Sequence, residues 1–173
     1  MFARTPRLTL RPGWPEDAAQ LTRAIAHEAV AFKLSRLPWP YTLDHAQAWL
    51  GGEPTPGDYP LLIFAHDRGP EPELVGGIGL HLHGAEEAGE LEIGYWLTPD
   101  AWGRGYATEA GRAVIDMARH ALGLPRLIGR HMVDNPDSGH VLRKLGFRPT
   151  GEGRLPCLAR GEEVPCITLE LPL

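Results

Sequence analysis

The stretch from Leu91 to Glu109 reads L-E-I-G-Y-W-L-T-P-D-A-W-G-R-G-Y-A-T-E. A strand-like run passes through a short loop, and a glycine-rich turn then opens a long helix. Gly103 and Gly105 remove side chains where an anion must approach the backbone. The unpaired N–H groups of the first helical turn would point at that anion, and the helix dipole adds positive potential. The segment therefore predicts a pyrophosphate-binding loop between a strand and a helix.

Two other phosphate-binding motifs do not fit this loop. A Walker-type loop needs a lysine directly after its glycines, and Tyr106 stands there instead. A Rossmann fingerprint needs glycine or alanine at position 108, where Thr108 stands, and an N-terminal strand–helix–strand context. Taken alone, the motif is also explained by an ordinary helix N-terminus with tight-turn glycines. The rest of the chain has to decide between these interpretations.

Hydrophobic periodicity and turn residues predict the elements around this segment. Strands are predicted at 7–11, 61–66, 74–82, 91–97 and 127–133, with two more from Phe147 onward and over 166–171. Helices are predicted from Pro15, over 43–50, over 107–122 and over 135–145. In the last helix Asn135 can be the N-cap and Gly146 the stop. The order β-α-α-β-β-β-α-β-α-β-β predicts a mixed α/β sheet.

Composition indicates one globular domain over residues 1–173. The chain has 173 residues, of which 43% are hydrophobic and 23% charged, both ordinary for a globular protein. A formal net charge of −5 argues against a surface built for nucleic-acid phosphates or anionic lipid. No apolar run approaches the roughly 18 residues of a membrane span. We therefore expect neither nucleic acid nor membrane as a partner.

The cysteines and the N-terminal residues indicate a compartment. Residues 1–11 contain no apolar signal region, so we expect no signal peptide. Two thiols, Cys157 and Cys166, are more often free than bonded in such a chain. We therefore expect a cytoplasmic protein.

Several segments together resemble one known family. Residues 102–107, W-G-R-G-Y-A, match the [Q/R]-x-x-G-x-[G/A] loop of the GNAT N-acetyltransferases except at the first position. Further agreement lies in T-P-R-L-T-L-R-P at 5–12, V-G-G-I-G-L at 75–80 and N-P-D-S-G-H-V-L-R-K-L-G-F at 135–147. The resemblance covers nearly the whole chain in the right order. It is greatest to the branch that contains ribosomal-protein N-terminal (alanine/serine) acetyltransferases.

The resemblance implies a fold and a cofactor site. The fold would be the GNAT fold of the α/β (α+β) class, a mixed, mostly antiparallel sheet with two splayed parallel strands and flanking helices. Acetyl-CoA, as co-substrate, would lie in the gap between the splayed strands. Asn135 would hydrogen-bond the cofactor near its thioester. Backbone groups of Trp96, Leu97 and Thr98 would pair with the pantetheine arm, and those of Trp102, Gly103, Arg104, Gly105, Tyr106 and Ala107 with the pyrophosphate.

The implied reaction is direct attack by a primary amine on the thioester. The chain has no G-x-S-x-G elbow, which agrees with a route without an acyl-enzyme. Glu92 is the candidate base, acting through a water, and a structural ion pair or turn is its alternative. Ser138 is the candidate general acid for the thiolate, and its alternative is a serine that satisfies the first turn of a helix. Many relatives carry tyrosine four residues later, where Leu142 stands here.

Further expectations concern two histidines, one helix carboxylate, the acceptor and the rival functions. His81 and His83 alternate on one strand face but lack a third ligand, so we expect no metal site and one histidine near the acceptor. Glu109 is expected to pair with Arg112 on an exposed helix face. The acceptor would be a protein N-terminus or a small-molecule amine, and a homodimer through the C-terminal strands is left open. The rival functions are a CoA-binding sensor without turnover and an acyltransferase that uses another acyl-CoA.

Overall fold

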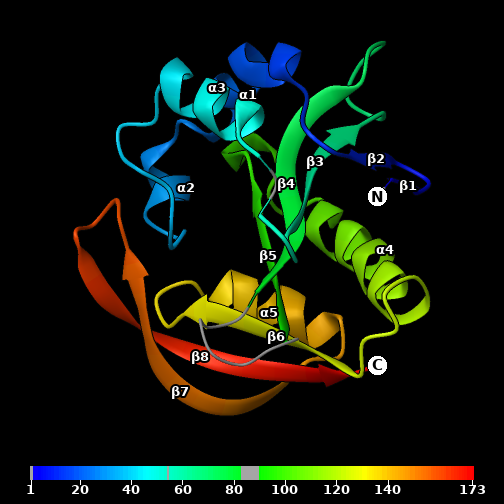
Figure 1. The fold of residues 1–173 in the computed structure, drawn as a ribbon, viewed down its shortest axis with the longest axis vertical. Helices are drawn as coiled ribbons and strands as arrows, with labels where there is room; N and C mark the ends of the chain where they lie inside the picture. The colour runs from blue at the N-terminus through cyan, green and yellow to red at the C-terminus, as the bar shows by residue number, and fades with distance from the viewer. Residues whose placement is uncertain (1, 54, 83–89) are drawn as a thin grey trace.

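A computed structural model describes residues 2–53, 55–82 and 90–173. Its strands form one eight-stranded mixed sheet (Figure 1). The strand order is β1-β2-β3-β4-β5-β6-β8-β7. The strands are β1 (Ala3–Arg4), β2 (Leu8–Arg11), β3 (Tyr59–Ala65), β4 (Glu73–Leu82), β5 (Leu91–Leu97), β6 (Arg126–Met132), β7 (Arg148–Cys157) and β8 (Glu162–Pro172). All neighbours pair antiparallel except β5 and β6, which pair parallel.

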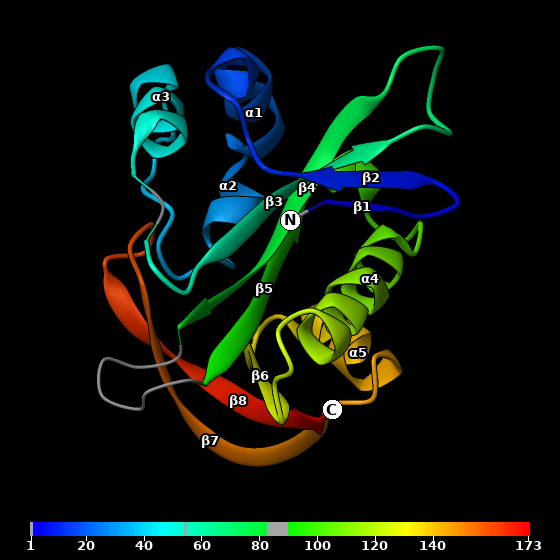
Figure 2. The ribbon, with the colours of Figure 1, turned by 45° about the vertical axis from the view of Figure 1, so that its right-hand side comes forward.

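Helices cover both faces of this sheet, as Figure 2 shows. One face carries α1 (Ala18–Ile25), α2 (Glu28–Ala31) and α3 (Leu43–Gly51), and we call it the α1 face. The other carries α4 (Tyr106–His120) and α5 (Pro136–Lys144), and we call it the α4 face. Two short 3₁₀ turns, η1 (Pro15–Asp17) and η2 (Pro99–Ala101), precede α1 and the glycine-rich loop. None of the described helices has both the length and the apolar character needed to cross a bilayer.

The parallel strands β5 and β6 separate soon after they meet. Glu92 pairs with Ile128 and Ile93 with Gly129, and in the described chain no later pair joins the two strands. Before and after this point β5 stays paired with β4 as far as Leu97, while β6 stays paired with β8. Figure 1 shows β5 and β6 running in different directions beyond the junction. The sheet therefore opens between two halves that each remain paired, one ending at β5 and the other beginning at β6.

Helix α4 shows why the sequence pattern was informative. Ala110, Val114 and Ala118 recur at helical spacing and are buried against the sheet. Arg112 and Asp116 lie between them in sequence and face solvent. A second buried cluster joins α1, α2 and α3 to the opposite face of the sheet. The central strands thus have a core on both faces.

The predicted mixed, mostly antiparallel sheet with one splayed parallel pair and flanking helices is confirmed, with local differences. The helix expected from Pro15 is divided into η1, α1 and α2, because the chain leaves helical geometry at Ala26 and His27. The short strand β1 was not predicted. Asn135 occupies the N-cap position of α5, but its side chain makes no capping hydrogen bond. Both cysteines are buried and free.

Candidate active site

The glycine-rich loop has the conformation that the sequence requires. Gly103 and Gly105 have φ values of +72° and +80°, in the left-handed region that favours glycine. Gly105 is the N-cap of α4, so no capping side chain covers the first N–H groups of that helix. Among the described residues no atom lies within 4 Å of where a Cβ of Gly103 would be. The loop therefore presents open backbone donors at a helix N-terminus, as an anion site needs.

The half-buried carboxylate of Glu109 holds the loop to the N-terminal segment. Glu109 Oε1 accepts hydrogen bonds from Thr5 Oγ1 at 2.6 Å and from the Arg7 amide at 3.0 Å. Its Oε2 accepts from Arg7 Nε at 2.7 Å. Arg7 Nη1 in turn donates to the carbonyl of Arg104 within the loop, at 3.0 Å. The expected pairing of Glu109 with Arg112 is wrong, because Glu109 is bound by Thr5 and Arg7 in the turn before β2.

The charged and hydrogen-bonded groups around Glu109 and Tyr106 shift one another's pKa values. Burial acts to raise the pKa of Glu109, but the hydrogen bonds from Thr5 and Arg7 outweigh it and hold that pKa below its usual range. Tyr106, the first residue of α4, donates to Asp67 Oδ1 at 2.6 Å. That hydrogen bond lowers the pKa of Asp67, while burial and Asp67 raise the pKa of Tyr106. The start of α4 is thus fixed by two separate carboxylates.

The predicted pantetheine partners lie at the edge of the gap, but they point in different directions. The amide of Thr98 donates to Val75 of β4 at 2.9 Å. Because successive strand residues direct their backbone groups to opposite sides, Trp96 also faces β4, while Leu97 faces the gap. The Leu97 carbonyl accepts a hydrogen bond from Trp102 Nε1 at 2.9 Å. The indole of Trp102 therefore links the end of β5 to the glycine-rich loop.

On the α4 face, Ser138 lies next to a phenol that the sequence reasoning missed. Tyr95 Oη is 2.9 Å from Ser138 Oγ and donates to the Ser138 carbonyl, also at 2.9 Å. Burial raises the pKa of Tyr95 to about 12, so its hydroxyl keeps its proton at physiological pH. Alternation along β5 could have revealed Tyr95, because it shares a face with Ile93 and Leu97, which pack under α4 and α5.

The neighbours of Ser138 in α5 take different positions. Asn135 is half-buried, and within the described chain its side-chain amide makes no hydrogen bond. Leu142 is 1% exposed and belongs to the core. His140 is exposed and lies 4.0 Å from the exposed Asp137. The half-buried polar side chains at the start of α5 are therefore those of Asn135 and Ser138.

Glu92 lies on the opposite face from Ser138, in an ion pair. Arg130 of β6 places Nε at 2.8 Å and Nη2 at 2.6 Å from Glu92 Oε2. The side chain of Glu92 is 8% exposed. Its strand partner His81 places Nε2 at 3.8 Å from the same oxygen. The structure thus shows the ion pair that was the alternative to a free base, and it adds an imidazole beside it.

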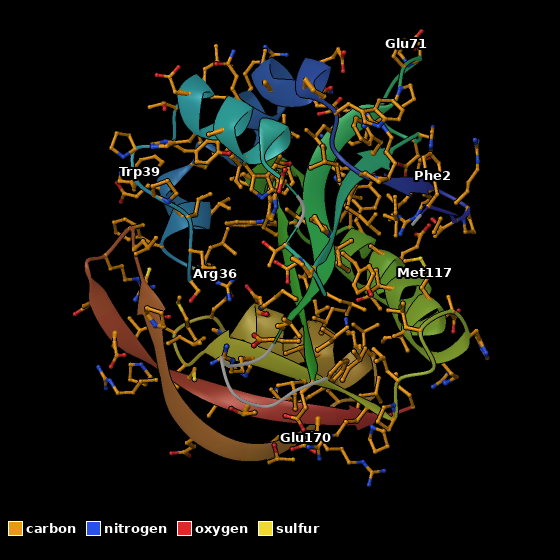
Figure 3. The ribbon with its side chains drawn as sticks, viewed as in Figure 1. Phe2, Arg36, Trp39, Glu71, Met117 and Glu170 are labelled. Atoms are coloured by element: carbon orange, nitrogen blue, oxygen red, sulfur yellow. The ribbon has the colours of Figure 1, made fainter. Side chains whose placement is uncertain are left out.

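On the α1 face, the segment after α2 is hydrogen-bonded to the end of β7 and to the turn between β7 and β8. Ser35 Oγ donates to the carbonyl of Pro156 at 2.8 Å, and the amide of Leu158 donates to Ser35 O at 3.1 Å. Arg160 Nε donates to the carbonyl of Phe32 at 2.8 Å. Figure 3 shows Arg36 and Trp39, from the same connection, on the α2 side of the molecule. The connection is thereby held beside the opening of the sheet.

In the part of the chain that the structure describes, no group of three His, Cys, Asp or Glu side chains is placed to hold a metal ion. His83 lies outside the described residues. His81 contacts Glu92 and Gly94 instead. What the arrangement offers is a helix N-terminus for an anion, hydroxyl donors on the α4 face and a charged cluster with a histidine on the α1 face.

Comparison with known proteins agrees with this geometry. Residues 7–148 match the family model described as acetyltransferase (GNAT) domain. The N-acetyltransferase YoaA of Bacillus subtilis (strain 168) is 38% identical over 79 residues, 46% of this chain and 44% of that protein. Matches of this kind span about half the length of the first curated relatives.

Solved structures show the same fold over the whole chain. A GNAT-family acetyltransferase from Bacillus anthracis superposes with a TM-score of 0.81 at 21% identity, covering 99% of this chain and 98% of that one. The ribosomal L7/L12 alpha-N-protein acetyltransferase RimL, in complex with coenzyme A, gives 0.80 at 16% identity, covering 100% and 98%. The resemblance inferred from the sequence is confirmed. With its family model matched over most of its length, the chain belongs to the GNAT acetyltransferase family.

Proposed function

We propose that this protein transfers an acetyl group from acetyl-CoA to a primary amine by direct attack in a ternary complex. One observation carries the proposal most strongly. The gap between β5 and β6 has an open glycine-rich helix N-terminus at its edge and polar side chains on both faces. A pyrophosphate with a long arm fits such an arrangement, because the phosphate charge meets the helix N-terminus while the arm extends along the exposed strand edge.

The residues present fit acetyl-CoA as co-substrate. Backbone N–H groups of 103–107 would bind the pyrophosphate, whereas the Trp102 N–H donates to the Pro99 carbonyl at 3.3 Å. The gap-facing backbone of Leu97 would pair with the pantetheine arm. The amides of Trp96 and Thr98 would shape that edge through their contacts with β4. The free side-chain amide of Asn135 would hydrogen-bond the cofactor near its thioester. Bound acetyl-CoA supplies the activated acetyl group, and the chain holds it.

Ser138 would donate a hydrogen bond to the sulfur as it leaves. A thiolate with a pKa near 8.5 is a tolerable leaving group, so a hydrogen bond is sufficient help. Tyr95 supports this role by fixing the serine in place, because its hydroxyl donates to the Ser138 carbonyl and its oxygen lies 2.9 Å from Ser138 Oγ. The two residues would then act as one donor unit on the α4 face.

Glu92 would assist deprotonation of the acceptor from the α1 face. The attacking amine must be neutral, and an α-amine with pKa near 7.8 is neutral roughly 10% of the time at pH 7. A lysine side chain near 10.4 would need about 4–5 kcal/mol to lose its proton. Arg130 holds the carboxylate of Glu92 in place, and Glu92 would act on the amine through a water. A protein N-terminus or a small-molecule amine is the proposed acceptor class.

The location proposed for this reaction is the cytoplasm. Both cysteines are free and buried, which supports a reducing compartment.

The test measures thiol release from acetyl-CoA with N-terminal peptides, polyamines, free amino acids and aminoglycosides. We expect one class to give release well above the rate with acetyl-CoA alone. Thiol release from another acyl-CoA but not from acetyl-CoA would show that the protein transfers a different acyl group. If no amine gives thiol release but acetyl-CoA still raises the melting temperature, a CoA-binding sensor is favoured. If there is neither thiol release nor a rise in melting temperature, the cofactor assignment is overturned.

A further inference from the structure

His81 lies on the α1 face beside the ion pair, in a position made by two strands. The β4–β5 register sets His81 opposite Glu92, and the residue after next on β5 is Gly94. A Cβ at Gly94 would come within 3.1 Å of His81 Cε1, tighter than an ordinary contact. The missing side chain at Gly94 therefore leaves room for the imidazole to lie over β5. Its Nε2 is then 3.8 Å from Glu92 Oε2.

Four charged groups act on this imidazole. They are Glu92 from β5, Arg130 from β6, Arg36 from the connection after α2, and Asp58 from the loop before β3. Two are anionic and two cationic, so their effects oppose each other, and burial is the largest influence. Burial lowers the pKa of His81 below its ordinary value of 6.5. The imidazole is therefore neutral at pH 7 and offers a lone pair, while 29% of its side chain remains exposed.

We propose that His81 takes the proton from the acceptor amine and that Glu92 balances the imidazolium that forms. This inference rests on the proposed function and assigns its proton acceptor to an atom. A neutral imidazole beside a carboxylate can accept a proton, and the carboxylate then stabilises the imidazolium, as in other histidine–carboxylate pairs. Glu92 alone is already hydrogen-bonded to Arg130 through Oε2. The carboxylate is thus a positioning and charge-balancing group, and the imidazole is the base.

The step balances as follows. The ammonium N–H bond breaks and its proton moves to His81, which leaves the lone pair on nitrogen. That pair forms the C–N bond to the thioester carbon, and the C–S bond breaks with its electron pair on sulfur. The second proton released from nitrogen goes to sulfur on the Ser138 side. His81 then returns its proton to solvent, and the products are the amide, free thiol and one proton.

This assignment narrows the acceptor class to amines of low pKa. Proton transfer from an α-ammonium of pKa about 7.8 to an imidazole at or below 6.5 is unfavourable by about twentyfold or more. From a lysine side chain of pKa about 10.4 it is unfavourable by roughly 8,000-fold or more. A weak base therefore suits an N-terminal α-amine and serves a lysine side chain poorly. We infer an acceptor that presents an α-amine or another amine of comparable pKa.

The test compares wild type and His81→Gln on the best amine of the panel as a function of pH. At pH 7 we expect kcat/KM for the amine to fall at least tenfold. Near pH 9.5 the α-amine is already neutral, so the defect should shrink to within about threefold. His120→Gln is the matched control, because His120 is exposed at the end of α4 and should leave the profile unchanged.

A second variant separates chemistry from folding. Added imidazole should restore at least part of the activity of His81→Ala at pH 7, while the acetyl-CoA thermal shift stays as in wild type. An equal loss at both pH values without rescue would show a structural role and overturn the inference. Unchanged activity in His81→Gln, or a lysine side chain as the best acceptor, would overturn it too. A wild type that acetylates no amine would instead overturn the proposed function.

Discussion

The hydroxyl of Tyr95 on β5 lies 2.9 Å from the Oγ of Ser138 on α5, across the opening between β5 and β6. The same hydroxyl donates to the Ser138 carbonyl at 2.9 Å. A strand residue and a helix residue are thereby tied together where the thioester sulfur would lie in the proposed complex. Leu142, at the position where the family resemblance implied that a tyrosine could stand, is buried in the core. The phenol beside Ser138 is instead that of Tyr95, on β5.

The first prediction concerns this pair. We expect Ser138→Ala to lower kcat at least tenfold, because it removes the hydrogen bond to the leaving sulfur. Tyr95→Phe should lower kcat about three- to tenfold, because Ser138 loses the partner that orients its hydroxyl. Both KM values should change little. Steady-state kinetics of thiol release measures each effect.

The double variant Ser138→Ala with Tyr95→Phe checks whether the two act together. If Tyr95 works through Ser138, the double variant should be no slower than Ser138→Ala alone. Multiplicative losses would show that Tyr95 acts independently of the serine.

The second prediction concerns the glycine-rich loop. Gly103→Ala should cost about 1 kcal/mol of folding free energy, because φ is +72°, and should weaken acetyl-CoA binding at least tenfold. Gly123→Ala is its matched control, since Gly123 has φ of +63° in the turn after α4 and, like Gly103, no described atom within 4 Å of its missing Cβ. Both variants should lose similar stability in urea, but only Gly103→Ala should lose affinity by calorimetry. Equal affinities would mean that the loop does not hold the phosphates.

The third prediction concerns Glu109 and its contacts with Thr5 and Arg7 behind that loop. Glu109→Gln removes the charge that Thr5 and Arg7 stabilise, so unfolding free energy at pH 7 should fall by about 1–3 kcal/mol. The KM for acetyl-CoA should rise severalfold, because Arg7 also holds the Arg104 carbonyl. Asp116→Asn, on the exposed face of α4, should change neither quantity. Urea unfolding and steady-state kinetics give the two measurements.

The stability defect of Glu109→Gln should also depend on pH. The folded protein holds the pKa of Glu109 below its usual range, so the carboxylate stabilises the fold above the unfolded value of about 4.3. This contribution is lost as the pH falls through the lower folded pKa. Wild type and Glu109→Gln should therefore converge in stability as the pH falls below about 4.3. A gap that persists there would point to lost packing instead of lost charge.

The sequence was sufficient for the fold because its signals are local. Helix α4 was read from apolar spacing, and the turn at Gly103 and Gly105 from residues that tolerate a positive φ. The boundaries at Ala26 and His27 were missed, since the apolar spacing continues through the break between α1 and α2. Local pattern thus fixes which elements exist better than where they end.

The site could be predicted only in part, because its contacts join distant segments. Glu109 finds Arg7 more than a hundred positions away, and nothing in the helix pattern indicates that pairing. Tyr95 meets Ser138 across the opening of the sheet, where only strand alternation offered a hint. His81 meets Glu92 through the β4–β5 register, which periodicity alone does not determine. Family motifs indicated the loop, and tertiary register supplied the partners.

The last prediction separates the two faces of the opening. Glu92→Gln removes the charge that Arg130 binds and that the proposed imidazolium needs, so kcat/KM for the amine should fall at least tenfold at pH 7. Acetyl-CoA binding should stay within about twofold of wild type, because the predicted cofactor contacts lie along the gap edge and the loop. Glu163→Gln is the control, since Glu163 is 65% exposed on β8 and pairs with Arg154 at 3.8 Å. Loss of acetyl-CoA affinity in Glu92→Gln would mean that Glu92 shapes the cofactor site instead of the acceptor side.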